Sequence, residues 1–85
     1  MNKKDIAIEM KHSVAELRGW AERLMPASRA LARELSDRAD SIENSMAGRG
    51  YDSERALITM GKVEGLVTAA QVLYSEWERF QSGNG

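Results

Sequence analysis

Cysteine is absent from this 85-residue sequence, and histidine and proline each occur once. Without cysteine the chain has no disulfides and no thiolate ligands for structural zinc, and one histidine cannot build a metal site alone. We therefore expect no metal and no cofactor. A single domain of this length, residues 1–85, hides only about 60–65% of the surface of its unfolded chain, so its stability must come from close helix packing or a partner chain.

The sequence also lacks an excess of one charge, because it contains 12 basic and 13 acidic residues. Nucleic-acid-binding proteins usually carry a clear basic excess, so a mainly electrostatic partner is not expected. The longest apolar run is far shorter than the roughly 20 residues that span a bilayer, and the charged start Met1–Asp5 is unlike a signal peptide. The sequence predicts a cytoplasmic protein with neither a membrane nor a small-molecule substrate as partner.

Strong helix formers fill the chain, and its few helix breakers predict where the helices end. Pro26, Gly48 and Gly50 divide it into helices near 3–24, 27–47 and 53–80, followed by a frayed tail at 81–85. Pro26 either occupies the first turn of a separate second helix or kinks one helix running from 3 to 47. The residue before proline avoids the α region, which favours a break and two helices meeting at a corner or open angle.

Apolar residues recur every three or four positions in the first two segments, as in packed helices. In 3–24 they are Ala7, Met10, Val14, Leu17, Ala21 and Leu24. In 27–47 they form a thinner stripe of Leu31, Leu35, Ala39, Ile42 and Met46, backed by charged residues. A thin stripe with a charged back predicts a surface helix.

The segment 53–80 is apolar on two sides. Its broad face holds Ala56, Val63, Leu66, Val67, Ala70, Leu73 and Trp77, and the opposite face holds Ile58, Gly61, Gly65, Ala69 and Val72. This pattern predicts a central helix between two neighbours. At about 42 Å against about 30 Å for a 20-residue helix, its C-terminal end has no cover in its own chain. We expect an all-α, three-helix bundle that dimerisation completes.

Two groups of residues in this region are candidates for a partner or dimer interface. Gly61, Gly65 and Ala69 form a ridge of small side chains that packs against a helix of the same chain or meets a second copy across a two-fold axis. The aromatic side chains are either core or interface anchors. The candidate interface comprises Trp20, Gly61, Gly65, Ala69, Tyr74, Trp77 and Phe80.

Catalytic and phosphate-binding candidates are few. His12 stands beside Ser13, but a catalytic triad also needs an orienting carboxylate and an oxyanion hole, which nothing in the sequence marks. We therefore expect no enzyme. Arg18, Arg29 and Arg33 could contact phosphates, although acidic residues are interleaved among them. The alternative function is thus a nucleic-acid-associated small subunit or regulator, for example of a packaging or transcription complex.

The stretch Met60–Leu66 resembles a pattern in the last helix of small phage- and prophage-encoded proteins. In that pattern a glycine is followed by alternating polar and apolar residues and then by a Gly-Leu or Ala-Leu step. The resemblance covers under a fifth of the chain. It implies a viral accessory protein in the host cytoplasm, either a morphogenesis component or an inhibitor of a host protein. We predict a non-catalytic protein–protein interaction module and homodimer, in its sharpest form a phage-type inhibitor or adaptor.

Overall fold

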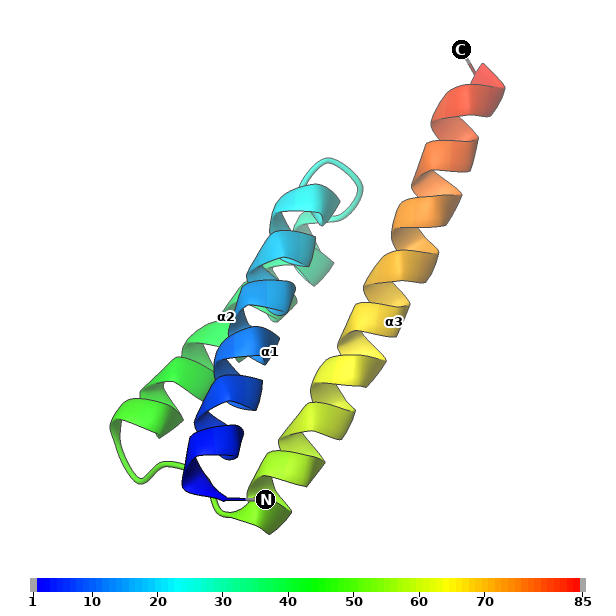
Figure 1. Cartoon of the computed structure of the whole chain (residues 1–85). Coiled ribbons are helices and arrows are strands. Elements are labelled where there is room, and N and C mark those ends of the chain that lie inside the picture. Colours follow the sequence, from blue (N-terminus) through cyan, green and yellow to red (C-terminus); the bar gives the residue numbers. More distant parts are fainter. Residues whose placement is uncertain (1, 85) are drawn as a thin grey trace.

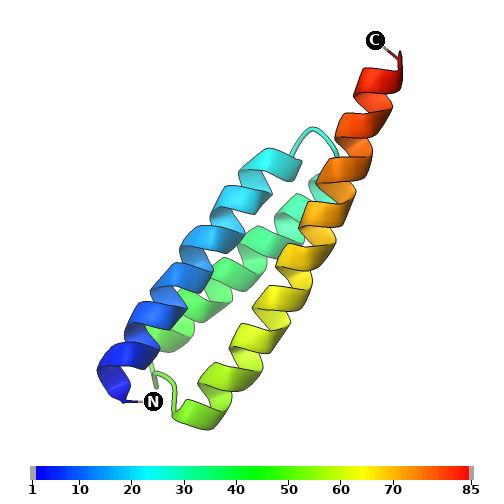
Figure 2. The same cartoon turned by 45° about the vertical axis from the view of Figure 1, so that its right-hand side comes forward.

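Three α-helices, and no strand, make up residues 2–84, the part of the chain that the computed structural model describes (Figure 1). They are α1 (Lys3–Leu24), α2 (Arg29–Ala47) and α3 (Ser53–Asn84). The helix α2 runs antiparallel to α1, and α3 runs in the same direction as α1 (Figures 1 and 2). The predicted all-α fold is confirmed.

The residue before each helix has a side chain that accepts a hydrogen bond from a backbone N–H of the first turn. Asn2 accepts from the amide of Asp5 at 2.8 Å, and Asp52 accepts from the amide of Arg55 at 2.8 Å. Ser28 accepts from the amide of Leu31 at 3.2 Å. These bonds satisfy donors that the first turn of a helix cannot pair internally.

Pro26 lies in the turn between α1 and α2, so the chain breaks there as predicted. The second helix begins at Arg29 and not near 27, because Ser28 caps it. The predicted open angle is wrong. The backbone amides of Ala27 and Ser28 donate to the carbonyl of Leu24 at 2.9 and 2.7 Å, and this tight turn folds α2 back along α1 as a hairpin.

The central helix is α1 and not α3, which corrects the prediction from the sequence. Nearly all helix–helix contacts are those of α1 with α2 and of α1 with α3. The thin apolar stripe of α2 can cover only one neighbouring helix, and it packs on α1. The second apolar side of α3 therefore has no helix to cover it. The buried core is formed by Ile6, Met10, Val14, Leu17, Ala21, Leu24, Ala32, Leu35, Ala39, Ile42, Ala56, Val63, Val67 and Ala70.

One position in the predicted seam of α1 is also corrected. Ala7 is exposed, and Ile6 is buried in its place. Ile6 lies four residues before Met10, on the same side of the helix, and brings the larger apolar side chain to the core.

The helix α3 continues through Asn84, so residues 81–84 are helical and not a frayed tail, while Gly85 lies outside the described residues. No proline interrupts the segment. Its 32 residues measure about 48 Å, against about 33 Å for the 22 of α1. The C-terminal end of α3 consequently projects beyond the turn between α1 and α2 (Figures 1 and 2). The predicted mismatch in length is confirmed.

Candidate interaction surface

Three of the predicted interface aromatics contact one another within the chain. The ring centroids of Trp20 and Tyr74 lie 5.9 Å apart in an edge-to-face arrangement, and those of Tyr74 and Trp77 are also 5.9 Å apart. The Arg23 guanidinium lies 4.9 Å from the centroid of the Trp20 ring. All three aromatic side chains are half-buried. This aromatic cluster joins α3 to the C-terminal part of α1 and therefore serves the fold.

Phe80 differs from the aromatic cluster because its side chain is 66% exposed. It lies near the C-terminal end of α3, which ends at Asn84. Gln81, Ser82 and Gly83, which follow it, are exposed as well. By exposure, the predicted aromatic set thus divides into three half-buried residues, Trp20, Tyr74 and Trp77, and the more exposed Phe80.

The predicted ridge of small residues does not pack against α1 or α2. Gly61, Gly65 and Ala69 are all exposed, and a Cβ atom added to either glycine would meet nothing within 4 Å. The packing alternative within the chain is therefore wrong.

Gly61 and Gly65 belong to a longer surface that follows the side of α3 turned away from α1, and Ala69 lies beside this surface. We name it the outer face and define it by exposed residues that alternate at spacings of four and three. They are Glu54, Ile58, Gly61, Gly65, Thr68, Val72, Ser75 and Arg79. Such spacing is the a/d repeat by which two helices pack along their length.

Large apolar side chains are exposed on and beside the outer face. Ile58 is 53% exposed, Val72 is 59% exposed and the flanking Leu57 is 59% exposed. Charges close its two ends, with Glu54 in the first turn of α3 and Arg79 near its C-terminus. Arg79 also pairs with Glu76 at 3.4 Å, an exposed contact of the kind that contributes little.

Arg18 is engaged by two carboxylates of α2. Its guanidinium donates to Asp40 at 3.1 Å and to Glu43. The hydrogen bonds to Glu43 and then to Asp40 raise the pKa of Arg18, so the side chain stays charged throughout the working pH range. Arg29 and Arg33 line a hollow that shares Met25 and Ser36 with a neighbouring hollow lined by Arg18. The three arginines thus lie in the same region of the surface, with Arg18 already paired to two carboxylates.

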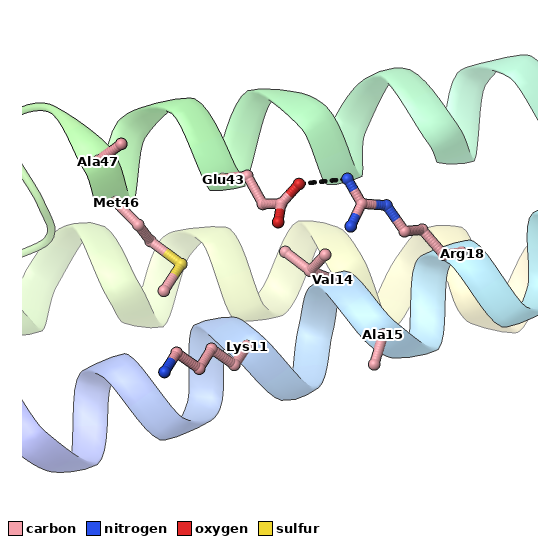
Figure 3. Close-up of a pocket in the computed structure, with 7 residues that line it drawn as sticks. All are labelled: Lys11, Val14, Ala15, Arg18, Glu43, Met46 and Ala47. Atoms are coloured by element: carbon pink, nitrogen blue, oxygen red, sulfur yellow. Dashed lines mark hydrogen bonds and ion pairs between the residues drawn. The ribbon is translucent and has the colours of Figure 1, made fainter.

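A groove between α1 and α2 lies next to Arg18 (Figure 3). Its lining combines the Arg18–Glu43 ion pair with apolar side chains of both helices. The lining residues are Lys11, Val14, Ala15, Arg18, Glu43, Met46 and Ala47. The charges in the groove are paired or at its edge, and no serine, histidine or second acid lies among them to form a nucleophile–base pair.

His12 and Ser13 do not form a catalytic pair. His12 is exposed and Ser13 is buried, since neighbouring residues of a helix point about 100° apart. Within the described part of the chain, no three His, Asp or Glu side chains are placed to hold a metal ion together.

The helix α3 is also, among residues 2–84, the one helix whose length and composition would allow it to cross a membrane. Core helices of soluble proteins meet the same criteria, so this observation is weak evidence. Lys62 and Glu64 lie in the middle of the segment, where a charged side chain would cost about 2.5–3.5 kcal/mol at the bilayer centre.

Comparison with protein-family models, with curated proteins and with solved structures finds no match to this chain. The functional proposals therefore rest on the residues of this chain and on their arrangement in the structure. Sequence reasoning found the small residues and the apolar pair Ile58 and Val72, but it missed the full repeat from Glu54 to Arg79. The spacing was legible in the sequence, although only the structure shows that this side of α3 is the uncovered one.

Proposed function

We propose that the chain is a non-catalytic, cytoplasmic protein–protein interaction module that forms a homodimer and docks on a larger protein. The observation that carries this proposal is the outer face of α3, which exposes Ile58 and Val72 by more than half although its other side packs on α1. Covering exposed apolar surface along a helix with a partner removes that surface from water, which favours association.

The two parts of the proposal use different surfaces. Self-association uses the outer face, and docking on the larger protein uses the projecting end of α3 that carries Phe80. An exposed aromatic on a rigid helix end suits an interface anchor, because aromatic side chains are frequent hot spots. The resemblance of Met60–Leu66 to phage- and prophage-encoded proteins supports the version in which the chain is a viral inhibitor or adaptor of a host protein.

Self-association is tested by a matched pair of variants. Ile58→Glu places a charge in the outer face, and Ile8→Glu makes the same change on α1 at a side chain of equal exposure, 53% against 52%. Sedimentation velocity should show that Ile8→Glu dimerises like the unaltered protein and that Ile58→Glu remains monomeric, with equal helicity in circular dichroism. Equal dimerisation of both variants would contradict the proposed surface.

Docking on a larger protein is tested by affinity purification from the native cell with Phe80→Ser beside the unaltered chain. One protein should be recovered in near-equal molar amount with the unaltered chain and lost with Phe80→Ser. Recovery of nucleic acid that falls steeply with salt would instead support the alternative function. Co-flotation of the chain with lipid vesicles would show that α3 enters membranes and would overturn the cytoplasmic proposal.

A further inference from the structure

We infer that two copies of the chain meet along the outer face in an antiparallel arrangement, with Glu54 of each copy beside Arg79 of the other. This inference rests on the proposed self-association and adds its direction and register. It follows from the order of residues along the outer face. When a second copy is laid antiparallel on the first, residues of opposite charge and of complementary size face one another.

When α3 is aligned with an antiparallel copy, the eight outer-face residues form four different pairs, and the two-fold symmetry repeats each pair. Glu54 faces Arg79 at the two ends. Toward the centre the pairs are Ile58 with Ser75, Gly61 with Val72, and Gly65 with Thr68. In antiparallel coiled coils each layer joins an a position to a d position of the partner, as all these pairs do.

Side-chain volume is complementary in every apolar layer of this register. Each larger side chain, Ile58, Val72 or Thr68, faces a serine or a glycine. A Cβ atom added at Gly61 or at Gly65 would meet no atom of the chain within 4 Å, so a facing valine or threonine side chain has room to enter. Large side chains inserted into spaces left by small ones give the close packing that helix pairs require.

A parallel pair would have none of this complementarity. Each outer-face residue would meet its own copy, so that isoleucine would face isoleucine and no larger side chain would enter the space over Gly61 or Gly65. Glu54 would face Glu54 and Arg79 would face Arg79, which places like charges together at both ends. The antiparallel pair also sets the two helix dipoles in opposite directions.

The size of the contact predicts a reversible dimer. The outer face from Glu54 to Arg79 is about 38 Å long and, at a helix diameter of about 10 Å, covers roughly 400 Å² in projection on each chain. Stable interfaces bury about 800 Å² of accessible surface on each partner, so a contact along one helix face is small and we expect a dimer that exchanges readily. The two projecting ends, each with Phe80, would lie at opposite ends of the dimer.

Disulfide trapping tests direction and register, and the lack of native cysteine makes it free of background. Ile58→Cys and Ser75→Cys, each in a separately tagged chain, are mixed in equal amounts and oxidised mildly, and the linked products are identified by intact mass. Facing positions of a helix pair come within disulfide reach, whereas positions at opposite ends of the face do not. We expect the mixed product, in which one chain of each variant is joined, to make up well over half of the linked chains.

The other outcomes each overturn the inference. A majority of identical-position products would show a parallel pair. A statistical mixture, with half of the products mixed, would show association without register. A dimeric chain that gives no disulfide would place self-association on another surface, and a chain that is monomeric throughout would overturn the proposed homodimer as well.

Charge exchange gives an independent check that leaves the core untouched. In the antiparallel pair, Glu54→Arg or Arg79→Glu alone replaces two attractive contacts with two repulsive ones. Each should weaken dimerisation about tenfold at low salt. Glu54→Arg together with Arg79→Glu should restore it, since the charges are then exchanged as a set. A double variant as weak as either single variant would contradict the register.

Discussion

Leu17→Ala tests whether the apolar seam of α1 lies at the centre of the core. Leu17 is fully buried in the core where α1 meets its neighbours. Replacing such a leucine with alanine removes its transfer free energy and leaves a cavity, at a cost of about 3 kcal/mol. For a domain of this size about 1 kcal/mol corresponds to 4–8 °C, so the melting temperature should fall by about 12–24 °C.

The matched control is Ile8→Ala, on the same helix but 52% exposed. It should change the free energy of unfolding by no more than about 1 kcal/mol. Urea unfolding followed by circular dichroism at low micromolar protein keeps any contribution of dimerisation small. A loss for Leu17→Ala no larger than the loss for Ile8→Ala would refute the burial of the α1 seam in the core.

Further substitutions test the remaining contacts. Tyr74→Ala, which loses ring contacts with two tryptophans, should lower the free energy of unfolding by about 2 kcal/mol in urea titrations, and Tyr74→Phe should lower it by under about 0.5 kcal/mol. Gly50→Ala should destabilise the fold by about 1–2 kcal/mol in the same assay, because Gly50 has a φ of 77°. Gly19→Ala, in a helix interior with no atom near the new methyl group, should stabilise it by about 0.5–1 kcal/mol. Arg18→Ala should reduce the melting temperature slightly at low salt and not at 1 M salt, because its two ion pairs are exposed.

Much of the fold could be predicted from local sequence signals. The break at Pro26 and most of the apolar spacing of each helix are set by neighbouring residues, and these predicted features agree with the structure. The predicted start of α2 is two residues too early, because it was placed from Pro26 and not from the capping residue Ser28. A serine three residues before Leu31 is the stronger signal, since its side chain caps the helix.

The arrangement of the helices could not be predicted in the same way. The segment 53–80 has two apolar sides, and its own sequence does not say which side a neighbour will cover. That choice depends on α1, which packs against α2 on one side and against α3 on another. The candidate surface was therefore found residue by residue at Gly61, Gly65 and Ala69, while its exposure and its full length became visible only in the structure.

The most direct test of the proposed homodimer is the mass of the unaltered chain as its concentration rises. Static light scattering from about 5 to 500 μM spans the range expected for an interface of this small area. The weight-average mass should rise from near 9.5 kDa toward twice that value and level off there, as a closed two-fold pair requires. A mass that stays at 9.5 kDa up to the highest concentration would contradict self-association through the outer face of α3.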